Sequence, residues 1–184
     1  MVTLPTSKFD VIVIDPPWTY AGSQTKWGAA AKFYKTLPDV DILAMDIQSI
    51  LNPRGIVFVW ATSPRLDMAM KAIHSWGLTF RGVSFVWVKT KQTGEPIRAQ
   101  GVRPSITKPT CEFVLAASRI AKGRPMQVSS EAVPNVVLCP KMRHSQKPEA
   151  VQDRIEQLYP DATKCEMFAR RVRPNWFCVG NEVS

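Results

Sequence analysis

The residues best suited to chemistry form one short motif near the start of the chain, Asp15-Pro16-Pro17-Trp18. The Asp15 carboxylate and the Pro16 carbonyl are hydrogen-bond acceptors, and the two prolines restrict φ and so hold that carbonyl in place. Such a pair of acceptors can bind both N–H groups of an exocyclic amine, such as N6 of adenine, and draw its delocalised lone pair toward attack. Trp18 offers a stacking face to a base turned out of its strand. The motif therefore suits the transfer of a group, held in line, to an aromatic amine.

The same motif also fits a turn that ends a strand, in which Asp15 caps the loop and the prolines stop the pairing. Taken alone, the motif does not separate these two interpretations. The apolar run before it, residues 9–14, predicts a strand that is buried on both faces. Ligands in open α/β sheets bind beyond the carboxyl ends of strands, so the motif stands where catalytic residues are expected.

Strands and helices alternate along the rest of the chain. Further strands are predicted at residues 56–60, 83–88, 112–117, 165–168 and 176–179. Because the two kinds of element alternate, we predict an α/β fold: a single Rossmann-like domain over residues 1–184, with a mostly parallel sheet and helices on both faces.

Three helices connect these strands. The first is predicted from one apolar stripe, formed by Val40, Leu43, Ile47 and Ile50. The second is predicted to begin at a Ser63 cap with Pro64 in its first turn, to bury a stripe that starts at Leu66, and to end at Gly77. The third follows Pro148 and ends before Pro160.

The charge balance points to a polyanionic partner. The chain has 24 Lys+Arg against 15 Asp+Glu, a formal charge of +9, which favours nucleic acid. A long polar segment at residues 89–110 is basic, and segments of this length in small domains are usually functional or mobile. We predict that Lys89, Arg98 and Arg103 in this loop bind phosphates without reading sequence, the alternative being a solvated loop.

Other classes of protein are disfavoured. The four cysteines show no metal-binding spacing and only two histidines could join them, so no metal is expected. The chain shows neither a secretory leader nor an apolar run of membrane-spanning length, so we expect a cytoplasmic protein without membrane contact. The glycine-rich phosphate fingerprint of dinucleotide folds is absent, which argues against an NAD-dependent or FAD-dependent oxidoreductase.

Several residues far from the motif could bind a ligand without a phosphate group. Lys147 precedes a Pro-initiated helix, where a cation gains nothing from the helix dipole, so a ligand carboxylate is a reasonable partner. Asn181 and Glu182 follow the last predicted strand, where an acidic side chain can bind ribose hydroxyls. His144 is compatible with a ligand contact or with an ordinary turn.

Taken in order, the short motifs of the chain resemble those of the MT-A type, messenger-RNA adenosine methyltransferase-like family of adenine-N6 methyltransferases. The resemblance covers nearly the whole chain and is closest to compact bacterial or phage members. Besides Asp15-Pro16-Pro17-Trp18 it rests on Tyr34-Lys35-Thr36-Leu37, Phe58-Val59-Trp60, Ser75-Trp76-Gly77-Leu78, Trp87-Val88-Lys89-Thr90, His144-Ser145-Gln146-Lys147-Pro148, Phe168-Ala169-Arg170 and Gly180-Asn181-Glu182.

The resemblance implies S-adenosylmethionine as the methyl donor and a permuted fold, in which the catalytic strand precedes the cofactor strand in sequence and lies beside it in space. By resemblance the catalytic residues are Asp15, Pro16, Pro17 and Trp18. The donor would contact Ile14, Asp15, His144, Lys147, Phe168, Arg170, Asn181 and Glu182. Tyr34 would hold the target base together with Trp18.

The polymer and the assembly are less defined than the chemistry. The compact chain, without an RNA-binding appendage, favours DNA as the substrate, with RNA as the alternative. A non-catalytic nucleic-acid-binding subunit of the same fold is a further alternative, although such subunits usually lose the acidic residue or the aromatic residue of the motif. A homo-oligomer or a partner subunit is compatible with the sequence.

Overall fold

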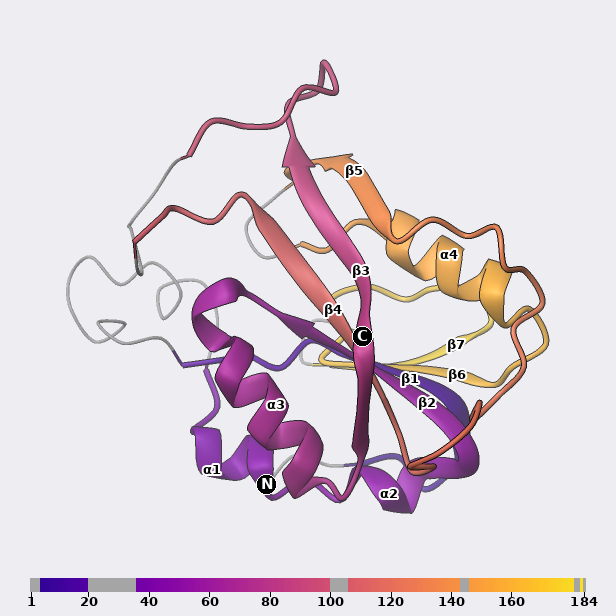
Figure 1. Ribbon diagram of the computed structural model, residues 1–184. Coiled ribbons are helices and arrows are strands. Elements are labelled where there is room, and N and C mark those ends of the chain that lie inside the picture. The colour runs from indigo at the N-terminus through magenta and orange to yellow at the C-terminus, as the bar shows by residue number, and fades with distance from the viewer. Residues whose placement is uncertain (1–3, 20–35, 100–105, 143–145, 181–182, 184) are drawn as a thin grey trace.

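A seven-stranded sheet with helices on both faces forms the body of the protein (Figure 1). The computed structural model describes residues 4–19, 36–99, 106–142, 146–180 and 183. The strand order is β5-β3-β4-β2-β1-β6-β7. The strands are β1 (Phe9–Ile14), β2 (Leu51–Ala61), β3 (Thr79–Thr90), β4 (Cys111–Ser118), β5 (Val136–Pro140), β6 (Lys164–Met167) and β7 (Trp176–Val179).

Strand direction confirms the predicted mostly parallel sheet. β1 pairs in parallel with β2 and β6, β6 with β7, and β3 with β5. Only β4 among these seven strands runs the other way, since it is antiparallel to both of its neighbours. The amino end of β4 therefore meets the carboxyl ends of the other strands at one edge of the sheet.

Helices cover the two faces of the sheet as predicted. On one face lie α1 (Asp39–Leu43), α2 (Ile47–Ile50) and α3 (Leu66–Ser75), and on the other lies α4 (Glu149–Leu158) (Figure 1). In β1, Ile12 and Ile14 pack in the core beneath α1 to α3, whereas Val11 and Val13 pack in the core beneath α4. The continuous apolar run of β1 thus reflects burial on both faces.

The single helix predicted between residues 40 and 50 is wrong. The structure has two short helices there, and the Asp46 side chain accepts a hydrogen bond from the Ser49 N–H at the start of the second. This cap starts a new helix in a different phase, so one apolar stripe cannot extend through both. Val40 is accordingly 68% exposed, and Ile42 is buried in its place.

The start of the next helix also differs from the prediction. Ser63 is not a side-chain cap, because a 3-10 turn, Ser63–Arg65, precedes α3 and closes through the Arg65 N–H and the Thr62 carbonyl. Leu66 is 36% exposed, while Ala69 and Ile73 carry the buried face. The physical reason is that the short turn rotates the first residue of α3 away from the core.

Two strands are longer than their apolar residues predict, and one strand was not predicted at all. β2 and β3 begin several residues before their predicted starts, in stretches that contain polar residues, Gly and Pro. β5 was not predicted, because Val136-Val137-Leu138 lies between two prolines and resembles a loop. No helix within the described ranges has both the length and the apolar character needed to cross a membrane.

Candidate active site at the carboxyl edge of the sheet

A pocket of about 230 Å³ lies at the edge where the parallel strands end and β4 begins. Its walls come from segments far apart in the sequence, because β1, β2 and β6 are neighbours in the sheet and end together. The lining residues are Asp15, Pro16, Pro17, Trp18, Trp60, Ala61, Thr62, Lys89, Glu112, Lys141, Lys147, Phe168 and Arg170. The predicted catalytic motif and three predicted donor-binding residues, Lys147, Phe168 and Arg170, are thus brought together.

The motif turns sharply as it leaves β1. The Trp18 N–H donates to the Pro16 carbonyl over 2.8 Å, and the Leu37 N–H donates to the Pro17 carbonyl over 3.1 Å. These bonds fix the direction of both proline carbonyls. A carbonyl oxygen has two lone pairs, so the Pro16 carbonyl retains acceptor capacity for a substrate N–H.

Trp18 does not offer the open stacking face predicted from the sequence. Its side chain is 3% exposed and belongs to the core beneath α1 to α3. The indole Nε1–H donates to the Trp60 carbonyl over 3.2 Å, and the Arg65 guanidinium lies 5.7 Å from the ring centroid. A buried indole N–H requires a hydrogen-bond acceptor, and the bond to Trp60 holds the ring in the core. Trp18 therefore forms part of the pocket wall.

Four charged side chains of alternating sign cross the pocket. The Lys147 Nζ lies 3.0 Å from Asp15 Oδ1 and 3.2 Å from Glu112 Oε2. Lys89 Nζ lies 2.6 Å from the other oxygen of Glu112. Each of these four side chains is at most 20% exposed, so solvent screens their interactions only weakly. We call these four residues the pocket charge network; its net charge is zero.

Strand geometry explains how the network is assembled. Phe85 and Trp87 pack in the core beneath α4, so the two-residue period of β3 places Lys89 on the same face. Glu112 pairs with Trp87 across the β3–β4 ladder. Because β4 is antiparallel, its second residue reaches the edge where β1 ends at Asp15.

The network shifts the pKa of its members in directions set by burial and by pairing. Burial raises the pKa of Asp15 above its ordinary value, against the opposing charge of Lys147. Burial would also raise the pKa of Glu112, but the ammonium groups of Lys147 and Lys89 outweigh it and lower that pKa. Burial opposes the charge of Lys147, yet Asp15 and Glu112 raise its pKa, so Lys147 is a cation at neutral pH.

Glu112 is a charged pocket residue that was not predicted from the sequence. It was assigned only to a strand, and the one available signal was a charge at the start of an otherwise apolar run. The network also corrects one expectation: Lys89 belongs to β3 and pairs with Glu112 instead of lying in a phosphate-binding loop. Lys147, which is predicted to contact a ligand carboxylate, has two protein carboxylates as partners as well.

Phe168 and Arg170 reach the pocket through a strained turn after β6. Phe168 has φ 62°, in the left-handed region that non-glycine residues rarely adopt. The Ala169 N–H donates to the Val179 carbonyl over 2.9 Å. A Cβ on Gly180 would lie 2.0 Å from the Ala169 oxygen, so this close approach requires glycine.

The remaining predicted site residues divide into two groups. Ile14 does not line the pocket, because its side chain is fully buried in the core where β1 pairs with β2 and β6. Arg98 is exposed in the segment after β3, outside the pocket lining. Tyr34, Arg103, His144, Asn181 and Glu182 lie outside the described residues.

A mostly parallel sheet, covered by helices on both faces and with a charged pocket at its carboxyl edge, fits the class of enzyme predicted from the sequence motifs. Residues 9–182 match the MT-A70 family. The chain therefore belongs to the MT-A70 family and is a methyltransferase, which confirms the predicted resemblance.

Individual relatives match nearly the whole chain. The Type II methyltransferase M.MunI from Mycoplasma sp is 30% identical over 198 residues, covering 98% of this chain and 80% of the relative. The human N(6)-adenosine-methyltransferase catalytic subunit METTL3 is 29% identical over 178 residues, covering 96% of this chain and 28% of the relative. The N(6)-adenosine-methyltransferase MT-A70-like protein of Arabidopsis thaliana is 26% identical, and the chain spans 24% of its length.

Proposed function

We propose that this protein transfers the methyl group of S-adenosylmethionine to N6 of adenine in nucleic acid, and that DNA is the preferred polymer. The observation that carries the proposal is the ion pair between Asp15 and Lys147, which joins the Asp15-Pro16-Pro17-Trp18 motif to the start of α4 in one pocket. The names of the human and Arabidopsis relatives, which specify N(6)-adenosine, support adenine as the target.

The pocket lining suits the charged parts of the donor. The donor carries a carboxylate, for which the cations Lys147 and Arg170 are partners, and a sulfonium, for which carboxylates and aromatic faces are partners. An ammonium has three N–H donors, of which Asp15 and Glu112 engage two, and we assign the third of Lys147 to the donor carboxylate. Phe168 lines the same pocket and offers an apolar face.

Asp15 and Pro16 activate the target amine in this proposal. With Asp15 Oδ1 held by Lys147, Oδ2 accepts one N6–H and the Pro16 carbonyl accepts the other, which restores nucleophilic character to the nitrogen. S-adenosylmethionine, held by Lys147 and Arg170, would supply an electrophilic methyl group to this nitrogen and leave as a neutral thioether. Asp15 would accept the proton that the nitrogen loses once it is methylated.

Glu112 keeps the pocket charge network electrically neutral. The ammonium groups of Lys89 and Lys147 would otherwise face a cationic sulfonium with Asp15 as their only counter-charge. Repulsion among buried cations is strong, because the surrounding dielectric is low. We therefore assign Glu112 a supporting role for both the donor and Lys147.

The direct test incubates the purified chain with S-adenosylmethionine carrying a labelled methyl group and with oligonucleotides of one sequence, made as duplex DNA, single-stranded DNA and RNA. We expect label on adenine, most in DNA, and none with Asp15→Ala. Asp41→Ala is the matched control, since Asp41 is an exposed aspartate of α1. Label on cytosine, or undiminished transfer by Asp15→Ala, would overturn the proposal.

The experiment also separates the alternatives. Label confined to RNA would identify RNA as the polymer and leave the chemistry intact. Binding of oligonucleotides without transfer would favour a non-catalytic subunit. The presence of both Asp15 and Trp18 argues against that outcome.

A further inference from the structure

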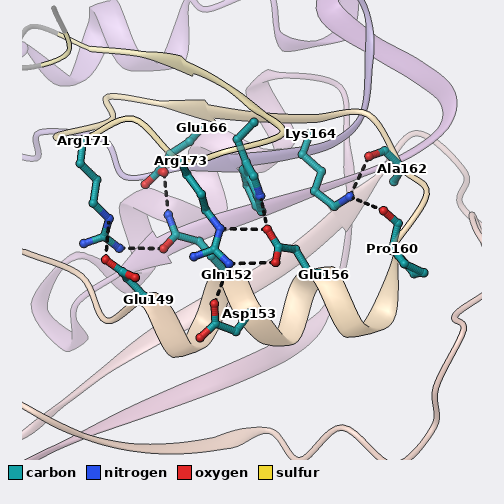
Figure 2. A network of polar contacts seen from close by, with 11 residues as sticks. Glu149, Gln152, Asp153, Glu156, Pro160, Ala162, Lys164, Glu166, Arg171 and Arg173 are labelled. Atoms are coloured by element: carbon teal, nitrogen blue, oxygen red, sulfur yellow. Dashed lines mark hydrogen bonds and ion pairs between the residues drawn. The ribbon is translucent and has the colours of Figure 1, made fainter.

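A second polar network joins α4 to the turn between β6 and β7 (Figure 2). Arg171 lies at one end of this network (Figure 2) and directly follows the pocket residue Arg170. Arg171 Nε lies 3.3 Å from Glu149 Oε1, and Nη2 donates to Gln152 Oε1 over 2.9 Å. Glu149 and Gln152 are three residues apart, so both lie on the helix face that Arg171 approaches.

The Arg171 guanidinium also contacts the backbone at Lys147. Its Nη1 donates to the Lys147 carbonyl over 3.5 Å, while the Lys147 ammonium lies 3.0 Å from Asp15. Arg171 therefore holds the main chain of the residue whose side chain enters the pocket. One guanidinium connects two walls of the pocket, the segment with Arg170 and the segment with Lys147.

Gln152 extends this connection to the sheet. Its Nε2 donates to Glu166 Oε2 over 2.6 Å, and the two residues are 4% and 9% exposed. Glu166 lies in β6, one residue before Met167, whose carbonyl accepts the Asp15 N–H over 3.5 Å. The chain of contacts thus runs from the strand beside Asp15, through α4, to Arg171.

Apolar packing alone does not fix the start of α4. Val151 is buried in the core, but apolar contact has little directional preference and tolerates small shifts along the helix axis. Hydrogen bonds from a guanidinium are directional. Pro148 holds the residue before it extended, so any shift of the first turn moves Lys147 with it.

We propose that Arg171 is a positioning residue of the donor pocket, which sets the distance between the Lys147 ammonium and Arg170 without touching the donor. This inference rests on the proposed function, in which that pocket binds S-adenosylmethionine. Arginine suits the role because its rigid fork can contact three partners at once, which a lysine ammonium on a flexible stem cannot reproduce.

Arg173 provides a matched control in the same segment. It also binds α4, but farther along the helix. Arg173 Nη2 lies 2.6 Å from Asp153 Oδ1, and Arg173 Nε donates to Glu156 Oε1 over 2.9 Å. If both arginines served only to stabilise the fold, Arg171→Met and Arg173→Met would have the same effect on donor binding. A positioning role predicts a difference in donor binding.

The test measures the dissociation constant of S-adenosylmethionine by calorimetry, the KM for donor and for oligonucleotide, kcat and the melting temperature, for the full chain and each variant. We expect Arg171→Met to weaken donor binding and raise the donor KM about tenfold, as misplaced binding groups do, with the oligonucleotide KM unchanged. The donor KM of Arg171→Lys should lie between those of the wild type and Arg171→Met. Arg173→Met should lower the melting temperature and leave the donor KM at the wild-type value.

Equal donor affinity in Arg171→Met and the wild type, or equal losses in Arg171→Met and Arg173→Met, would overturn the inference. If Arg171→Met does not fold, the pair Arg171→Lys and Arg173→Lys applies the same criteria. A wild-type chain that does not bind the donor would refute the proposed function itself, whereas a wild type that binds and an Arg171→Met that binds equally would refute only the role of Arg171.

Discussion

The two edges of the sheet use basic residues in different ways. At the carboxyl edge, Lys89 and Lys147 are partly buried and paired with carboxylates. At the amino edge, exposed arginines bind main-chain carbonyls: Arg54 donates to the Pro125 carbonyl over 2.7 Å, and Arg81 donates to the Ala121 carbonyl over 3.2 Å. The second arrangement ties a loop to the sheet and needs no buried charge.

Burying charges is costly, and well-packed apolar residues often stabilise a fold as well or better. A network of four charges, of which Glu112 is buried and the other three are partly buried, is therefore poorly explained by stability, and such sites are frequently functional. The difference between the edges supports the proposal that methyl transfer takes place at the carboxyl edge. Substitutions at the carboxyl edge should change both activity and stability, and those at the amino edge only stability.

The largest effect is expected for Glu112→Gln. It leaves two partly buried ammonium groups with one carboxylate, and breaking a buried ion pair costs roughly 3–5 kcal/mol of unfolding free energy. Methyl transfer should fall together with stability. Glu131→Gln is the matched control at the amino edge, where Glu131 pairs with Arg124 on the surface and both side chains are more than 70% exposed, so a change within about 0.5 kcal/mol is expected. Chemical denaturation measures the unfolding free energy of both variants. Equal losses in Glu112→Gln and Glu131→Gln would contradict the proposed difference between the two edges.

Lys147→Met should weaken the binding of the methyl donor by roughly 10- to 100-fold, which is the range expected when a hydrogen bond to a charged group is lost. It should also move the acid limb of the pH profile. In the proposed mechanism activity requires ionised Asp15 and is lost as pH falls through its raised pKa. The Lys147 charge opposes that rise, so removing it shifts the acid limb to higher pH. Measured kcat/KM against pH tests this, with Lys91→Met as a control at the exposed pair with Glu95. An unmoved limb would contradict the coupling.

Glu166→Gln should change the pH dependence of stability. Burial raises the pKa of Glu166 from 4.5 to about 6, so the folded state binds the proton more tightly than the unfolded state. The resulting destabilisation is fully present above pH 6 and disappears as pH falls toward 4.5, and it amounts to about 2 kcal/mol. The variant should be more stable than the wild type at pH 8 by up to this amount. Thermal unfolding from pH 4 to 8 provides the measurement, and a less stable variant at pH 8 would refute it.

The smallest effect is expected at the amino edge. Arg81→Ala removes the hydrogen bonds to the carbonyls of Ile120, Ala121 and Gly123. These bonds are exposed, so a loss of about 1 kcal/mol is expected, with methyl transfer unchanged when assayed below the melting temperature. A loss of transfer would show that the two edges are not functionally distinct.

Elements with local signals were predictable from the sequence. β1 is marked by its apolar run and α4 by Pro148 followed by an amphipathic pattern, and both occur as predicted. The pocket residues Asp15, Lys147, Phe168 and Arg170 were identified through motif order, and the structure places them together.

Features that depend on pairing between distant segments were not predictable. Glu112 reaches the pocket only because β4 is antiparallel, and strand direction is set by tertiary pairing, not by the residues of the strand. The burial of Trp18, which lies after β1, depends on an acceptor in β2, the Trp60 carbonyl. The break between α1 and α2 depends on one cap, Asp46, which a periodicity of apolar residues does not register.

The central claim, that Asp15 activates the amine at N6 of adenine, is tested most directly by analysing the product nucleosides. Wild-type protein and Asp15→Asn are incubated with donor and DNA, and the digested product is examined by mass spectrometry. Asn has nearly the shape of Asp but lacks its charge. We predict N6-methyladenine from the wild type and none above background from Asp15→Asn; methylation at another atom, or wild-type yield from the variant, would contradict the account.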